Sequence, residues 1–151
     1  MADNDLTPLL TTLQGIISQF SPAGRRDMAK AIARNLRASQ AERIKANIAP
    51  DGHAYEPRKP QKLRNRKGNI KRKMFQKLIR TQWLKAKASA DEATVQFVGN
   101  ATRIARISQF GLRDRVNKKG VEAQYPQREL LGLTEKEKDQ IEDLVLGLLS
   151  R

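Results

Sequence analysis

Several residue types that support chemistry are scarce in this 151-residue sequence. It has no cysteine and a single histidine, His53, and aromatic residues make up 5% of the chain. Without cysteine, disulfide bonds and thiolate metal sites are excluded. The sequence also has neither a glycine-rich phosphate-binding loop nor a nucleophile elbow. We therefore expect a protein that is not an enzyme, with no catalytic residue, no cofactor and no metal, and His53 as a solvated loop residue.

Long apolar runs are missing as well. No stretch reaches the eighteen or so consecutive apolar residues that suggest a membrane span. The first twenty residues contain two Asp and no Lys or Arg, and Thr, Gln and Gly interrupt their apolar residues, unlike a signal peptide. We expect no membrane contact, and a reducing cytoplasm is the default compartment for a chain without cysteine.

Positive charge, in contrast, is abundant. The chain has 30 Lys and Arg against 16 Asp and Glu, which gives a formal net charge of +14. Eleven of these cations lie within residues 57–80, where there is no acidic residue. Such a charge attracts nucleic acid, an acidic membrane face or an acidic protein surface, and its sign alone does not choose among them. The side chains predicted to contact DNA or an acidic partner are Arg58, Lys59, Lys62, Arg64, Arg66, Lys67, Lys71, Arg72 and Lys73.

Periodicity predicts two helices in the first third of the chain. The Thr-Pro pair at residues 7–8 is a start signal, and apolar residues then recur at spacings of three and four up to Phe20. The Ser-Pro pair at residues 21–22 repeats the signal and predicts a long second helix that ends near Ile48. The apolar stripe expected on this second helix consists of Met28, Ile32, Leu36, Ile44 and Ile48.

The pattern in the middle of the chain predicts first an extended arm and then a hairpin. Three prolines and an Asp-Gly pair within residues 50–60 end the helix and predict a turn followed by an extended strip. Helical spacing resumes at residues 74–79. Alternating apolar and polar residues over 84–98 then predict two antiparallel strands around the Asp-Glu pair at 91–92.

The last third of the chain predicts a short helix, a weaker hairpin and a terminal helix. Asn100 is placed to cap a helix that carries apolar residues and stops at Gly111. Turn residues at 117–120 predict the second hairpin, and Thr134 followed by Glu137 forms a capping box before the terminal helix. The apolar residues expected on the short helix are Ala101, Ile104, Ile107 and Phe110.

These elements predict the α+β class, with long N-terminal helices, a small antiparallel sheet of hairpins, a short helix and a C-terminal helix. The length fits one domain. We divide it into an N-terminal helical region (1–48), a basic extended arm or loop (49–73) and an α+β body that forms a ring (74–151).

The segment "YPQRELLG", residues 125–132, has two interpretations. Its leucines are suited to stapling the terminal helix to the core, whereas Tyr125 and Arg128 are residue types enriched at the centre of protein interfaces. Both interpretations stay open at this point. The residues predicted at a subunit interface are Gln109, Phe110, Gly111, Tyr125, Pro126, Arg128, Leu130 and Leu131.

Three stretches together resemble the phage virion morphogenesis family of contractile-tailed temperate phages. They are "PDG…Y.PRK" from residue 50, "QFG" after the short helix, and "YP.R.LLGL" before the terminal helix. The resemblance spans nearly the whole chain from Ile44 onward. Relatives tend to have His where this chain has Ser108, and Pro where it has Glu129.

This resemblance implies a structural assembly protein of the virion. It would be a tail completion or neck component at the head-proximal end of the tail, made in the host cytoplasm, and would make the tail competent for head joining. The implied partners are further copies of itself in a homohexameric ring, the tail terminator or tube, the head-neck connector proteins and, without sequence specificity, packaged double-stranded DNA. The alternative from the residues alone is a non-specific cellular nucleic-acid-binding protein, for which the net charge is the whole argument.

Overall fold

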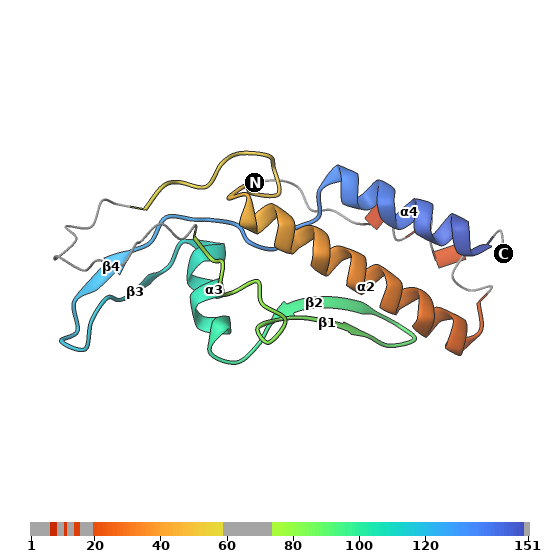
Figure 1. The fold of residues 1–151 in the computed structure, drawn as a ribbon, viewed down its shortest axis with the longest axis horizontal. Helices are drawn as coiled ribbons and strands as arrows, with labels where there is room; N and C mark the ends of the chain where they lie inside the picture. The colour runs from red at the N-terminus through yellow and green to blue at the C-terminus, as the bar shows by residue number, and fades with distance from the viewer. Residues whose placement is uncertain (1–6, 9–10, 12–13, 16–19, 59–73, 150–151) are drawn as a thin grey trace.

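The computed structural model describes residues 7–8, 11, 14–15, 20–58 and 74–149, and these form an elongated α+β body (Figure 1). This confirms the predicted class. The elements are α2 (Pro22–Lys45), β1 (Leu84–Ala88), β2 (Ala93–Phe97), α3 (Ala101–Phe110), β3 (Arg113–Arg115), β4 (Glu122–Gln124) and α4 (Glu135–Leu149). The helix predicted from residue 7 to Phe20 and the arm at 59–73 lie largely outside the described residues. No helix among those described is long and apolar enough to cross a membrane.

Helix α2 is the axis of the body. It starts where predicted, because the Ser21 hydroxyl accepts a hydrogen bond from the Gly24 amide (3.1 Å) and Pro22 occupies the first turn. Its 24 residues give a length of about 36 Å. The predicted end near Ile48 is wrong by three residues, because Asn47 adopts a left-handed backbone conformation (φ 58°) and turns the chain away.

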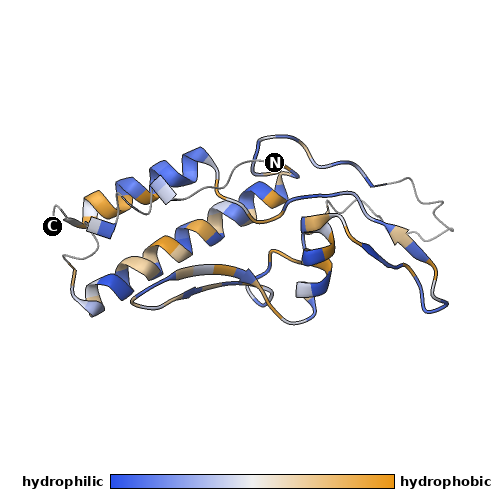
Figure 2. Cartoon of the chain, turned by 180° about the vertical axis from the view of Figure 1, so that it is seen from behind, coloured by the Kyte–Doolittle hydropathy of each residue, from blue (hydrophilic) through white to orange (hydrophobic). Residues whose placement is uncertain are grey.

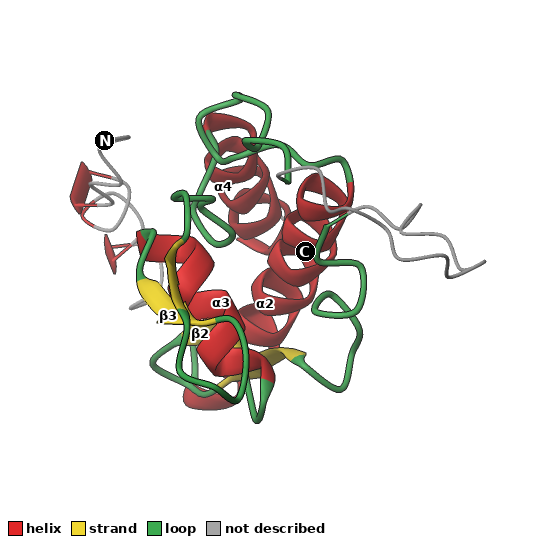
Figure 3. Cartoon of the chain, turned by 90° about the vertical axis from the view of Figure 1, so that its left-hand side faces the viewer, coloured by secondary structure: helices red, strands yellow, loops and turns green. Residues whose placement is uncertain are grey.

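Two layers cover α2. Helix α4 packs on one side, and the β1–β2 hairpin lies on the other (Figures 1 and 3). The hairpin was predicted, and its register pairs Leu84 with Phe97 and Ala88 with Ala93. Arg37 of α2 holds the start of the hairpin by donating to the carbonyls of Leu84 (2.6 Å) and Ile79 (2.9 Å).

Helical spacing at residues 74–79 proved misleading. The chain there forms a series of turns instead of an α-helix. Phe75 has a φ of 66°, and its carbonyl accepts hydrogen bonds from the amides of both Leu78 and Ile79. Met74 and Leu78 are nevertheless buried, so the apolar residues were correctly recognised as core while the backbone conformation was not.

The core consists of two clusters along α2. The larger one, at the C-terminal end of α2, contains Ile44, Tyr55, Met74, Leu78, Ala101, Ala105 and Leu130. The smaller one, between α2 and α4, has Met28 and Val145 buried, with Phe20, Ile32, Ile141, Leu144 and Leu148 packed against them. In α4, the apolar residues that supply this cluster lie in the C-terminal half of the helix (Figure 2).

Helix α3 turns a different face inward from the one its isoleucines suggested. Its buried residues are Ala101, Ala105 and Ser108, whereas Ile104 is 53% exposed and Phe110 63% exposed. Small side chains face the core because α3 packs closely against the larger cluster. Asn100 stands at the N-cap position without making a capping hydrogen bond, contrary to prediction, while Gly111 ends the helix in the predicted left-handed conformation (φ 63°).

The second hairpin, β3–β4, has the predicted turn. Asn117 Oδ1 accepts from the amides of Lys119 (3.0 Å) and Val121 (3.3 Å), which fixes the reversal at residues 117–120. The hairpin extends from the end of the body that is remote from α4 (Figure 1). The capping box of α4 is half formed: the Glu137 amide donates to the Thr134 hydroxyl (3.1 Å), but the Glu137 carboxylate points elsewhere.

Candidate assembly surfaces

Residues 125–134, which we call the strap, connect β4 to α4 and cross the C-terminal end of α2 (Figure 1). They include the "YPQRELLG" segment. No regular secondary structure forms there, so the strap backbone needs partners from elsewhere in the chain for its buried amides and carbonyls.

Helix α2 supplies the first of these partners. The Arg43 guanidinium donates to the Leu130 carbonyl and to the Gln40 side-chain oxygen, and also to the Ile48 carbonyl (2.9 Å). The Gln40 amide group pairs with Gly132 in both directions, at 2.7 Å to its carbonyl and 3.2 Å from its amide. The last turns of α2 therefore fix the position of the strap.

Helix α3 supplies the second set. The Gln109 side-chain oxygen accepts from the amides of Leu130 and Leu131, both at 2.9 Å, and its nitrogen donates to the Leu131 carbonyl at 2.9 Å. The Arg128 amide donates to the Ser108 carbonyl (2.7 Å). The Gln109 side chain thus makes the backbone hydrogen bonds that a neighbouring strand would make to Leu130 and Leu131.

The strap in turn holds the loop that leads into the basic arm. Arg128 is buried, and its guanidinium donates to the carbonyls of Glu56 (2.7 Å) and Pro57 (3.2 Å). Burial lowers the pKa of Arg128. The Tyr55 hydroxyl donates to the Glu129 carbonyl (2.8 Å), and burial raises the pKa of this phenol. Arg58, the first cation of the arm, therefore leaves the body at a defined point.

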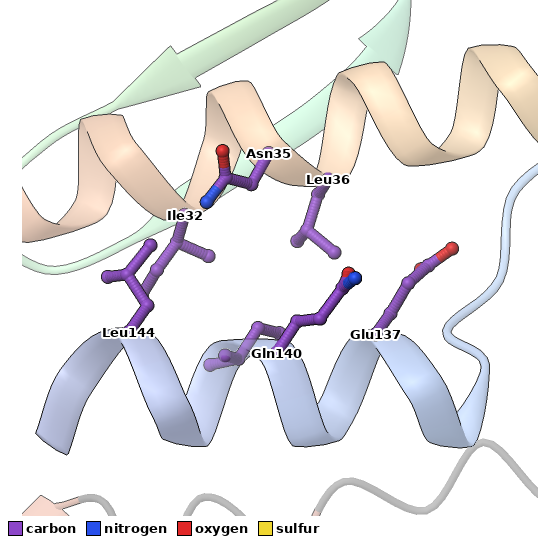
Figure 4. A pocket seen from close by; sticks show the side chains of 7 residues that line it. Ile32, Asn35, Leu36, Glu137, Gln140 and Leu144 are labelled. Atoms are coloured by element: carbon purple, nitrogen blue, oxygen red, sulfur yellow. The ribbon is translucent and has the colours of Figure 1, made fainter. Parts of the chain in front are cut away.

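A buried carboxylate links α4 to α2. Glu137 accepts from the Ser39 hydroxyl (3.0 Å) and from the Gln40 amide nitrogen (2.6 Å), and it is almost fully buried. Beside it is a small cavity of about 10 Å³, into which side chains of both helices point (Figure 4). That space is enough for about one water molecule and far too small for a substrate.

Two larger hollows lie at the surface. One, of about 270 Å³, is bordered by the loop at 49–56 and by strap residues 127–129. The other, of about 440 Å³, lies between α3 and β3 and is bordered by Arg103, Arg106 and Arg113. Arg103 pairs with Asp114 there, and this hydrogen bond lowers the pKa of the carboxyl group. Both hollows are open to solvent, and the one beside the strap has the more polar lining.

Neither hollow carries a metal site. Within the part of the chain that the structure describes, no three His, Cys, Asp or Glu residues are grouped so as to hold a metal ion. His53 is exposed, and its Nδ1 lies 3.2 Å from Asp51 Oδ1 in the turn after α2. That is the solvated loop position expected of it.

The eight residues predicted at a subunit interface lie together, at the C-terminal end of α3 and along the strap. They differ in exposure, however: Arg128 and Leu130 are buried within the chain, and Phe110 is mostly exposed. The other five are half-buried: Gln109, Gly111, Tyr125, Pro126 and Leu131. Their assignment to a subunit interface stays a prediction.

The predicted DNA or acidic-partner contacts are described at one position only. Arg58 is exposed at the end of the described loop, and the other eight cations, from Lys59 to Lys73, lie outside the described residues. The polar network around the strap was not predicted, although Gln109 and Arg128 were named as interface residues. Gln40 and Arg43 carried no signal in the sequence, and Glu137 was noted only as part of a capping box.

Comparison with known proteins shows which family the chain belongs to. Residues 4–150 match the family model described as the phage virion morphogenesis family. The chain belongs to this family. Family membership thus confirms the resemblance that the three sequence stretches suggested, and it extends that resemblance into the N-terminal region.

A relative within the phage virion morphogenesis family is Tail completion protein S of Escherichia phage P2. The two are 42% identical over 140 residues, which cover 92% of this chain and 93% of the phage P2 protein. No solved structure matches the chain. The family match therefore covers both core clusters, the strap and the hairpins together.

Proposed function

We propose that this chain completes the phage tail. It is a structural assembly protein, a tail completion or neck component at the head-proximal end of the tail, and it makes the tail competent for head joining. The observation that carries this proposal is the 42% identity to Tail completion protein S over 92% of the chain. At that identity and coverage, relatives keep the same fold and commonly the same role in assembly.

The described residues support an assembly role more than a catalytic one. The most elaborate polar arrangement, around the strap, consists of hydrogen bonds that hold the chain's own backbone. We infer that the strap network is a framework rather than a reactive site, and that the protein is not an enzyme. The framework presents the exposed end of α3, including Phe110, in a fixed position.

Self-association is the second part of the proposal. An exposed Phe110 beside the strap is the kind of apolar anchor that subunit interfaces bury. A contact between two different surfaces of the same chain closes into a ring when the rotation between copies allows it. We propose a homohexameric ring in the virion, between the tail terminator or tube and the head-neck connector proteins.

Complementation tests the role, and one variant tests the interface. A phage lacking its tail completion gene should regain head-joined particles when this chain is supplied in the infected cell. Phe110→Ala should leave the melting temperature unchanged and reduce both ring size and particle yield, because the side chain lies at the surface. Ile104→Ala, another exposed apolar truncation on the same helix, is the control. If Phe110→Ala behaves like the control, the interface prediction is wrong.

The basic arm has two candidate ligands in this role. If residues 58–73 face packaged DNA, affinity for duplex of any sequence should fall steeply with salt, because each phosphate contact releases counterions. If they dock on an acidic neighbouring ring, the protein should prefer that ring to random duplex at the same salt concentration. A salt titration against both ligands separates the two.

A cellular nucleic-acid-binding protein remains the second candidate, favoured by the net charge of +14. Such a protein would bind duplex without forming rings and would be missing from particles. Sedimentation of the purified chain, together with its detection in purified virions, discriminates between the two functions.

A further inference from the structure

The tip of the β3–β4 hairpin exposes apolar side chains in a fixed geometry. Val116 and Val121 lie opposite each other just beyond the ends of β3 and β4, with the Val116 amide donating to the Val121 carbonyl (2.8 Å), and they are 56% and 55% exposed. Lys118 and Lys119 follow in the turn, both exposed. A two-stranded hairpin is marginally stable by itself, and exposed paired valines are typical of a surface that a partner covers.

The outer face of α4 is net acidic, with Lys136 as its one exposed cation. Its exposed acidic residues recur at helical spacing and end at an apolar residue, Leu146, which is 54% exposed. They are Glu135, Asp139, Glu142 and Asp143. Lys138 reaches Glu135 (3.0 Å), while no described cation forms an ion pair with the other three carboxylates. In a chain with a net charge of +14, this is an unusual concentration of unpaired acid.

These two surfaces lie at opposite ends of the elongated body, so they cannot meet within one copy (Figure 1). They complement each other in both respects: two valines and two lysines on the hairpin, and a leucine and three carboxylates on the helix. Opposite charges on facing patches guide association and fix its register. The opposite placement is what a head-to-tail contact between copies requires.

We propose that the β3–β4 hairpin tip of one copy docks on the outer face of α4 of the next copy. Val116 and Val121 cover Leu146, and Lys118 and Lys119 pair with Asp139, Glu142 and Asp143. This inference rests on the self-association in the proposed function and names the surfaces that make it. The contact is heterologous, so repeating it builds a ring when the rotation between copies closes, and never a symmetric dimer.

Charge reversal on each side tests the contact. One variant carries Lys118→Glu and Lys119→Glu, and the other carries Asp139→Lys and Glu142→Lys. Each alone should weaken association about tenfold or more, because like charges then face each other. Mixed in equal amounts, the two should associate at least as well as the wild type, since every interface in an alternating ring again pairs opposite charges. Sedimentation velocity at low salt reads out all three samples.

The control reverses two lysines of the same exposure elsewhere. Lys85→Glu with Lys87→Glu, on the exposed side of β1, changes net charge by the same amount as the hairpin variant and should associate like the wild type. Thermal unfolding of each variant checks that the exposed substitutions leave the fold intact.

Several outcomes would overturn the contact. It is wrong if either variant associates like the wild type, if the mixture fails to recover, or if the wild type stays a monomer at every concentration reached. Loss of association in the hairpin variant alone would mean that the two lysines contact a surface of the next copy other than α4. Complementation by the wild-type chain is scored separately, so tail completion stands or falls independently.

Discussion

The strap and the β3–β4 hairpin are neighbours in the sequence, yet they satisfy their backbone in different ways. The strap has no regular structure, and side chains of α2 and α3 bind its amides and carbonyls one by one. The hairpin bonds across its own strands and leaves its valines exposed at the tip. The strap is therefore held by long-range contacts, whereas the hairpin forms from local ones.

This difference separates stability from recognition. Removing a strap contact leaves a buried polar group or a cavity, which costs stability directly. Removing a hairpin side chain changes only what a partner meets. Substitutions in the strap should therefore lower the free energy of unfolding, whereas substitutions in the hairpin should change association. The largest effects on unfolding should come from the strap and from the side chains that bind it.

The strongest test of this comparison is Leu130→Ala against Val121→Ala. Leu130 is fully buried in the larger core cluster, so its truncation should lower the free energy of unfolding by about 2–5 kcal/mol. Val121→Ala removes a mostly exposed side chain and should cost within about 0.5 kcal/mol. Urea denaturation measures both. Equal losses would mean that the two regions are not distinct in the way the structure indicates.

Two left-handed glycines give the next largest contrast. Gly111 has a φ of 63°, and a Cβ there would lie 2.9 Å from the Gln127 amide nitrogen of the strap. Gly120 has a φ of 86° in the hairpin turn, with open space around it. Gly120→Ala should cost about 1–2 kcal/mol from backbone conformation alone. Gly111→Ala should cost about 1–3 kcal/mol more, because the strap must move. A smaller loss for Gly111→Ala than for Gly120→Ala would contradict the close packing of the strap.

The sequence predicted the local elements well because their signals are local. Ser21, Gly111 and Thr134 mark helix ends through interactions within a few residues, and alternation revealed the first hairpin. Helical spacing failed at Phe75, where a left-handed residue interrupts an apolar pattern that fits a helix equally well. Periodicity identifies the apolar side chains, but it does not determine the backbone conformation between them.

The candidate site was harder to predict because it depends on partners far apart in the sequence. Gln40 and Gly132 are 92 positions apart, and nothing local marks either as one of a pair. Arg128 was predicted as an interface anchor, and sequence alone does not distinguish such an anchor from a buried arginine that binds backbone carbonyls. In α3, the apolar content was clear while the inward face was not, because alanine and serine, rather than isoleucine, fit the close contact with the core.

A buried acid and an exposed acid on the same helix provide a smaller contrast. Glu137→Gln removes a charged acceptor and sets an amide group against Gln40, so it should cost about 1–3 kcal/mol. Glu135→Gln removes a surface pair with Lys138 and should change stability by about 0.5 kcal/mol or less. Urea denaturation of both variants in the same buffer measures the difference. A small effect at Glu137 would mean that α4 does not depend on the strap network for its position.

The smallest expected effect concerns the hydroxyl of Tyr55, at the edge of the strap. Tyr55→Phe removes its hydrogen bond to the Glu129 carbonyl and should cost about 0.5–1.5 kcal/mol at neutral pH. Because burial raises the pKa of the folded phenol above its ordinary value near 10, the wild type holds this proton more tightly when folded. The stability it contributes is complete below that ordinary value and is lost as the pH rises through the raised one. The difference between wild type and Tyr55→Phe in urea should therefore shrink on going from neutral to strongly alkaline pH, and a constant difference would show that the phenol does not titrate in contact with the strap.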